Sequence, residues 1–343
     1  MKTSLIGLVL AYGVVAALPC GHIPDPTNIG DVQDAVHTTA ETAKTAGDLS
    51  KCGDLQKQTV SYDEEMDLGG SVAVNFAASN RGLYLDYAKG STSEMREPSN
   101  VKFNEGPGTK ASKYVTLVGK NLALQSTRAD IAWKFGILNN DKAVNAVSAP
   151  GGYVLITKAL LEKVQNEDQL AGVLAHEIGH VVARHALKVY QAVKTNQCKA
   201  AALSDSELAN QASEAGMGAI DPGGYRNEMK NLVDSGSDAF DLNANLNVLT
   251  MFTNKVVEEI TTKGYDSEQE FEADQIAADL LGSAGYSVDE YMKFLGTLKS
   301  DSTAFAHHPP PADRIKAINK HLQEKANPFV APKRDKPVPK AVQ

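Results

Sequence analysis

Two histidines and a glutamate occur together in the segment His176-Glu177-Ile178-Gly179-His180. Apolar residues recur around them at helical spacing, which predicts a buried amphipathic helix over residues 169–185. Residues four apart stack on one face of a helix, so His176 and His180 can hold one Zn²⁺ at about 2.0–2.1 Å from each nitrogen. Glu177 is rotated by about 100° from His176 and flanks the metal, where it can take a proton from a water that the metal activates.

Short matches to this pattern also arise by chance, and such a helix can simply be part of a core. The surroundings of the motif argue against that reading, because two histidines and a glutamate interrupt a strongly apolar segment. Burying these polar groups without partners would cost several kcal/mol. A bound metal removes that cost, so the segment predicts a zinc site.

A catalytic zinc needs a third protein ligand and an open coordination position. Two common spacings are absent, since Ala183 and Ala186 stand where a metzincin carries Gly and His, and Lys199 stands where an aminopeptidase carries Glu. His185 misses the metzincin position by one residue, or about 100° around a helix. It is therefore predicted to be structural or exposed to solvent.

A second helix is predicted to begin with a carboxylate cluster at 268–274. Glu270 and Asp274 are four apart and share a face, while Glu272 points elsewhere. We expect Glu270 to be the third ligand and Asp274 to hydrogen-bond a ligating histidine. Alternatively, Ser267 and Glu270 form a capping box at an acidic helix N-terminus. Capping does not explain Asp274, a full turn further in, so pairing with the two-histidine site is the stronger interpretation.

The elements that would position these residues can be predicted in outline. From residue 157 the chain is expected to be mainly helical, and Asn139-Asn140-Asp141 is expected to be a turn. Before residue 157, the predicted segments are helices at 63–78 and 114–124, a loop at 88–112, and short strands at 133–137, 143–147 and 153–156.

The first 17 residues have the layout of a secretory signal peptide rather than of a buried helix. Lys2 precedes an apolar run of 13 uncharged residues that ends in small side chains and is too short for a membrane span. Cys20 also permits a lipid anchor, but Leu18 and Pro19 do not match a lipobox, so simple cleavage fits better. Export permits disulfides. Cys20, Cys52 and Cys198 form an odd set, for which Cys20 with Cys52 is one example of a pairing.

Composition indicates one large domain with appendages, since 42% of the residues are hydrophobic and 22% are charged. A net charge of −8 offers no sign of a nucleic-acid partner. We expect a leader helix at 18–60 and a peptidase domain at 61–326, with insertions at about 88–112 and 196–238. A tail rich in Pro and Lys is expected at 327–343.

Several ordered segments resemble metallopeptidase family forty-eight, the gluzincin-type zinc endopeptidases that include the CAAX prenyl proteases, HtpX and periplasmic BepA. The segments that carry the resemblance are Pro150 to Val154, Leu170 to His185, Glu270 to Asp274, His308-Pro309 with Arg314-Ile315, and Asp63 to Gly69. The resemblance implies an α+β, predominantly α-helical, zincin-like fold. Such a fold has an active-site helix, a small β-sheet with a substrate-binding edge strand, and helices packed around the zinc.

The resemblance also implies roles for individual residues. One Zn²⁺ per chain would be held by His176, His180 and Glu270, with Glu177 as the general base and Asp274 as the supporting carboxylate. His308 would lie near the open coordination position, where it could hold the enzyme off, unless it is only a histidine in a Pro-rich turn. The strand around 145–149 would pair with an extended protein or peptide substrate.

The membrane spans of the prenyl-protease and HtpX branches are missing, which argues against prenylated peptides as substrates. Together with the signal-peptide layout, the resemblance implies an exported, periplasmic member that acts on misfolded or unassembled envelope proteins. Two alternatives stay open. The chain could be a metal-stabilised chaperone or adaptor with weak or regulated proteolysis, which the basic tail and the 196–238 insertion favour. It could also hold a purely structural zinc, with His308 as the fourth ligand. Association with an outer-membrane surface and the oligomeric state are not decided by the sequence.

Overall fold

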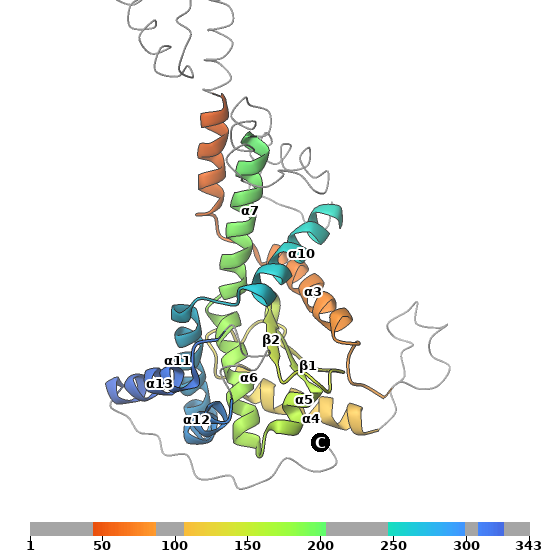
Figure 1. Cartoon of the computed structure of the whole chain (residues 1–343), viewed down its shortest axis with the longest axis vertical. Helices are drawn as coiled ribbons and strands as arrows, with labels where there is room; N and C mark the ends of the chain where they lie inside the picture. The colour runs from red at the N-terminus through yellow and green to blue at the C-terminus, as the bar shows by residue number, and fades with distance from the viewer. Residues whose placement is uncertain (1–43, 87–105, 204–245, 299–307, 326–343) are drawn as a thin grey trace, which may run out of the picture. The chain divides into compact units, whose positions relative to one another are not determined.

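The computed structural model describes residues 44–86, 106–203, 246–298 and 308–325 (Figure 1). Two compact units make up the chain: Met1–Thr59 with Gln191–Phe240, and Val60–Tyr190 with Asp241–Gln343. The predicted signal peptide at 1–17, Cys20 and the tail at 327–343 lie outside the described residues. So do residues 87–105 and 204–245, which include most of the two predicted insertions.

The smaller unit contains two described helical segments, residues 44–55 and the C-terminal part of α7 (His185–Leu203). A disulfide joins Cys52 to Cys198, and both cysteines are fully buried. The pair is therefore not Cys20 with Cys52, the example that the sequence offered. Residues 196–203 are helical, so the predicted loose stretch begins later than 196.

A three-stranded sheet in the order β1-β3-β2 lies in the larger unit. It contains β1 (Lys134–Leu138), β2 (Ala146–Ala149) and β3 (Tyr153–Thr157), close to the three predicted strands. β3 pairs in parallel with β1 and antiparallel with β2, so the turn after β1 does not form a hairpin. Within the part of the chain that the structure describes, β2 is an edge strand.

Eight complete helices of the larger unit lie in the described residues, together with the start of α7. They are α3 (Tyr62–Ser79), α4 (Pro107–Ala123), α5 (Lys158–Lys163), α6 (Glu167–Val182), α10 (Leu246–Thr262), α11 (Ser267–Ala284), α12 (Val288–Gly296) and α13 (Pro311–Glu324). Of these, α3, α4, α5 and α6 contact the sheet. α4 begins within the segment predicted as a loop, because proline at the first helical position already has the φ angle of a helix. No described helix combines the length and the apolar run needed to cross a bilayer. The predicted α+β, predominantly helical class is confirmed.

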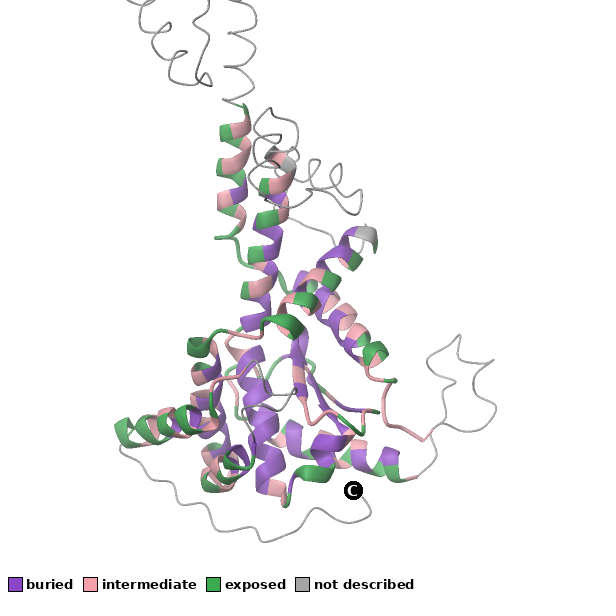
Figure 2. Ribbon diagram, viewed as in Figure 1, coloured by how far each residue is buried: buried purple, intermediate pink, exposed green. Residues whose placement is uncertain are grey.

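α6 lies at the centre of the larger unit and is buried around most of its circumference (Figure 2). Asn166 caps its start by accepting a hydrogen bond from the backbone N–H of Gln169. The helix packs most extensively on α11. A Cβ atom at Gly179 would lie 2.7 Å from the carbonyl oxygen of Ala273, so the two backbones approach more closely than any larger residue would allow.

A buried ion pair joins α3 to α6 and to the turn before β3. Arg128 donates hydrogen bonds of 2.8 and 2.9 Å to the two carboxylate oxygens of Glu65. Arg128 also donates to the carbonyl of Val181, and Glu65 accepts a hydrogen bond from the backbone N–H of Gly151. Gly151 has φ 72°, which favours glycine at this turn. These contacts fix the end of α6 relative to the sheet.

Candidate metal centre

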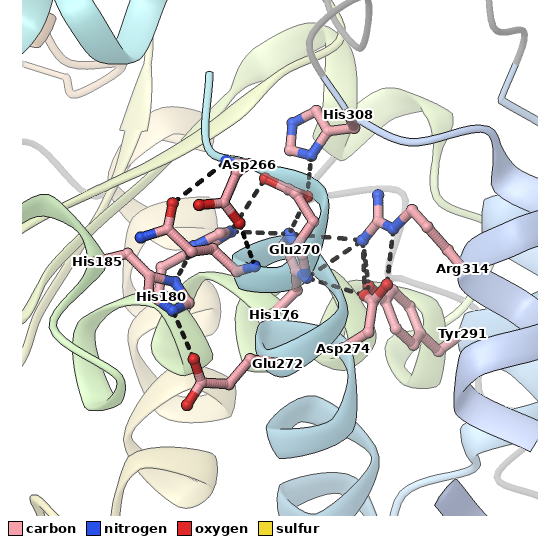
Figure 3. Close-up of polar contacts among 11 residues, drawn as sticks. His176, His180, His185, Asp266, Glu270, Glu272, Asp274, Tyr291, His308 and Arg314 are labelled. Carbon is pink, nitrogen blue, oxygen red and sulfur yellow. Dashed lines mark hydrogen bonds and ion pairs between the residues drawn. The ribbon is translucent and has the colours of Figure 1, made fainter. Parts of the chain in front are cut away.

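Three side chains converge from two helices at one point (Figure 3). His176 and His180 project from successive turns of α6, and their Nε2 atoms lie 3.1 Å apart. Carboxylate oxygens of Glu270, on α11, lie 3.5 Å from His176 Nε2 and 3.6 Å from His180 Nε2. Ligand atoms at about 2.0–2.1 Å from a tetrahedral zinc are roughly 3.3–3.4 Å apart. Both the spacing and the types of these donors fit one zinc ion.

Glu270 is free to reach the histidines because a different pair caps α11. The capping box is formed by Asp266 and Gln269, whose side chains each accept a hydrogen bond from the other's backbone N–H. The alternative that placed the cap at Ser267 and Glu270 is therefore wrong by one residue. Glu270 is buried within the first turn of α11.

His176 is supported by a buried carboxylate. Its Nδ1 lies 2.9 Å from Asp274 Oδ1. Arg314 donates to both oxygens of Asp274, at 2.8 and 2.7 Å, and the hydroxyl of Tyr291 donates to Oδ1 at 2.7 Å. Burial alone would raise the pKa of Asp274, but Arg314 and His176 hold it below its ordinary value. Asp274 therefore remains ionised and can accept a hydrogen bond from Nδ1–H of His176.

His180 is supported differently. Its Nδ1 lies 2.8 Å from Nδ1 of His185, and Nε2 of His185 lies 3.0 Å from Glu272 Oε2. His185 is fully buried, so of the two expected roles the structure excludes solvent exposure and agrees with a structural one. α6 ends at Val182 and Arg184 adopts φ 58°, so the angle expected along one continuous helix does not apply.

A cleft of about 130 Å³ is lined by two of the convergent groups, His180 and Glu270. Burial raises the pKa of Glu177, which lines this cleft, and nearby His176 and His308 oppose that rise. The edge strand β2 lines the same cleft, so the predicted general base and the predicted substrate strand face a common space. The complete lining is Asn145, Ala146, Val147, Ser148, Glu177, His180, Ile260, Thr261, Gly264, Tyr265, Glu270 and His308.

His308 lies at the cleft beside the third candidate ligand. Its Nδ1 is 2.5 Å from Glu270 Oε2. His176, Glu270 and His308 also form a group in which one ligand atom from each lies within 4.8 Å of the others. His308 is thus close enough to compete for Glu270 or to contribute to the metal centre.

Sequence reasoning did not identify two tyrosines that contact the site, and it left the role of one arginine undecided. Tyr291 lies in α12, where no motif indicates that it reaches Asp274. Tyr265 stacks on the ring of His180, with 4.3 Å between centroids, and only its position before the carboxylate cluster could have suggested a role. Arg314, one of the residues that carry the family resemblance, pairs with Asp274.

Known proteins resemble this chain over part of its length. The beta-barrel assembly-enhancing protease of Escherichia coli (strain K12) is 28% identical over 197 residues, which are 56% of this chain and 34% of that protein. Metalloprotease YcaL of the same strain is 25% identical over 223 residues, 62% of this chain and 72% of its own length. The mitochondrial metalloendopeptidase OMA1 of Schizosaccharomyces pombe is 35% identical over 85 residues, a quarter of each chain.

This chain spans about a third of the length of the beta-barrel assembly-enhancing proteases that it matches. The model of one family, described as Peptidase family M48, matches residues 109–322. That match covers more than half of the chain and includes all six residues predicted to form the site. The resemblance inferred from the motifs is confirmed, and the chain belongs to peptidase family M48.

Proposed function

We propose that the chain is a zinc-dependent metalloendopeptidase that hydrolyses peptide bonds in exported, misfolded or unassembled envelope proteins. The observation that carries the proposal is the convergence of His176, His180 and Glu270, at distances that suit a tetrahedral zinc, beside a cleft that Glu177 lines. The names of relatives in family M48, two proteases and a metalloendopeptidase, support the reaction class.

His176, His180 and Glu270 would hold one zinc ion beside the cleft that Glu177 lines. When bound, the ion supplies a Lewis acid that activates water and polarises the scissile carbonyl. Glu177 accepts the proton of the attacking water and returns it to the leaving amine. A buried carboxylate with a raised pKa suits this double role, because it holds a proton more readily than an exposed glutamate does.

Substrate binding would use the edge strand β2. An extended segment can add to the exposed edge of a sheet through backbone hydrogen bonds. Ala146, Val147 and Ser148 belong to β2 and line the cleft that holds Glu177. Backbone pairing imposes little side-chain selectivity, which suits an enzyme for unfolded protein or peptide substrates. An exported, periplasmic location is part of this proposal.

The test is cleavage of a denatured protein by the wild type and by Glu177→Gln. The variant should bind zinc and unfold at the same temperature as the wild type. Its hydrolysis rate should fall by about 10²–10⁴-fold, the contribution typical of a general base. Wild-type activity should be lost with a chelator and restored by zinc. Substantial cleavage by purified Glu177→Gln, with contaminating peptidases excluded, would reject the role of Glu177.

A second candidate function is a metal-stabilised chaperone or adaptor whose proteolysis is weak or regulated. The contact of 2.5 Å between His308 and Glu270 favours it, because this contact engages a candidate ligand. Binding of unfolded protein that persists in Glu177→Gln, together with little turnover by the wild type, would support the adaptor.

A further inference from the structure

We propose that His185 and Glu272 are positioning residues that fix the tautomer and the orientation of His180 for metal binding. The inference rests on the proposed zinc site and adds a series of hydrogen bonds that supports its second histidine, His180. It assigns a role to His185, which the motif spacing did not predict, and to Glu272, which turns away from the ligand face of α11.

Hydrogen-bond chemistry allows one assignment of protons along the series from His180 through His185 to Glu272. A neutral imidazole has one N–H donor and one acceptor nitrogen. His180 Nε2 faces His176 and Glu270, so a metal there requires that His180 carry its proton on Nδ1. His180 Nδ1–H then donates to His185 Nδ1 at 2.8 Å, and His185 Nε2–H donates to Glu272 Oε2 at 3.0 Å. Each donor meets an acceptor, and the last acceptor in the series is a carboxylate.

The backbone conformation allows this series of hydrogen bonds to form. Arg184 is one of two non-glycine residues with positive φ among the described residues, at 58°, and it directly precedes His185. Such a conformation is uncommon outside glycine, and it interrupts the helix between α6 and α7, directly before the residue that contacts His180. Glu272 belongs to the same helix as Glu270. α11 therefore supplies both a candidate ligand and the terminal acceptor, and the first residue of α7 supplies the imidazole between His180 and Glu272.

The two ligating histidines would thus be supported in different ways. His176 contacts the carboxylate of Asp274 directly, at 2.9 Å. His180 reaches a carboxylate only through the imidazole of His185, which is fully buried. Tyr265 stacks on the ring of His180 and restricts its rotation further. Groups that orient metal ligands typically contribute about 10–100-fold to metal affinity.

The experiment compares zinc affinity, by competition with a chromogenic chelator, in the wild type and three variants. His185→Leu removes both hydrogen bonds, and Glu272→Ala removes only the terminal acceptor. Glu268→Ala is the matched control, since Glu268 is an exposed glutamate of α11 that lies four residues before Glu272. His185→Leu should weaken binding by about 10–100-fold and Glu272→Ala by about 10-fold, with Glu268→Ala unchanged. Because Glu272 is half-exposed, Glu272→Ala should fold even if His185→Leu does not.

A second measurement reads the protons directly. In the zinc-loaded protein with ¹⁵N-labelled histidine, NMR should show His180 protonated on Nδ1 and His185 protonated on Nε2. A His185 protonated on Nδ1 would overturn the proposal, and so would equal losses of affinity in Glu272→Ala and Glu268→Ala. Wild-type affinity in every variant that folds would also overturn it while leaving the zinc enzyme intact. Failure of the wild type to bind zinc would reject the proposed function itself.

Discussion

At the scale of single residues, the metal-free centre holds a proton that zinc has to displace. Burial and the neighbouring Arg314 disfavour the charged form of His176, but Asp274 and Glu270 outweigh them and raise the pKa of His176 to about 9. Burial alone would raise the pKa of Glu270, but hydrogen bonds from His176 and His308 hold it well below its ordinary value, so Glu270 is ionised at neutral pH.

Zinc binding at pH 7 should therefore release about one proton per ion. His176 must be neutral to bind a metal, and with a pKa of about 9 it is protonated at pH 7 in the metal-free protein. Zinc affinity should accordingly rise with pH up to about pH 9 and fall on acidification. Calorimetry in buffers of different ionisation enthalpy measures the released protons. The same titration of Glu177→Gln excludes a proton from Glu177, and a binding heat that is independent of the buffer would contradict the prediction.

His308→Ala should increase the rate of peptide hydrolysis if His308 competes for the metal centre. A hydrogen bond to a charged group contributes about 1.5–3 kcal/mol, so releasing Glu270 could raise the rate by about 10-fold. The measurement is initial-rate cleavage of a denatured protein at saturating zinc. His321→Ala is a control, since His321 bonds to Asp279 on the other face of α11 from the centre. An unchanged or lower rate in His308→Ala would count against an inhibitory role.

At the scale of elements, the centre depends on how closely α6 and α11 approach. Gly179→Ala should push the helices apart, because the added Cβ would meet the backbone of Ala273 at 2.7–3.0 Å. Overpacking of this kind costs about 1–3 kcal/mol, and zinc affinity should fall with it. Gly282→Ala on α11 meets nothing within 4 Å and should stabilise the protein by about 0.5–1 kcal/mol. Urea unfolding and chelator competition test both variants, and unaltered zinc affinity in Gly179→Ala would refute the argument.

Features within one helix could be predicted from the sequence, whereas features that depend on packing between helices and strands could not. The spacing of His176 and His180 within a helix is local, so their common face could be predicted. The position of β3 between β1 and β2 and the contact of Tyr291 with Asp274 depend on tertiary packing, which no local pattern encodes. His185 was misplaced for a related reason: a helical angle was extended past Val182, where α6 ends.

At the scale of the whole molecule, the disulfide and the metal centre belong to different units. Cys52 and Cys198 are 146 positions apart and lie in the smaller unit. All candidate zinc ligands lie in the larger unit. The redox state of the cysteines should therefore affect the stability of one unit and the chemistry of neither.

Replacing Cys52 and Cys198 together with serine should destabilise the smaller unit by about 2–4 kcal/mol, the usual contribution of a disulfide. Zinc affinity should stay at the wild-type value. Limited proteolysis should cut near 44–59 and 191–203 faster in the variant than in the oxidised wild type, and chemical reduction of the wild type should reproduce the effect. A drop in zinc affinity in the double variant would show that the two units are coupled.

The buried pair of Asp274 with Arg314 has a consequence for the growing polypeptide. During synthesis, the two histidines of α6 leave the ribosome long before Glu270, and Arg314 in α13 follows later still. Until α13 packs against α11, Asp274 lacks the cation that keeps it ionised beside His176. On the proposed function, the support of His176 would therefore be complete only after the last described helix has packed, and a nascent chain would lack it.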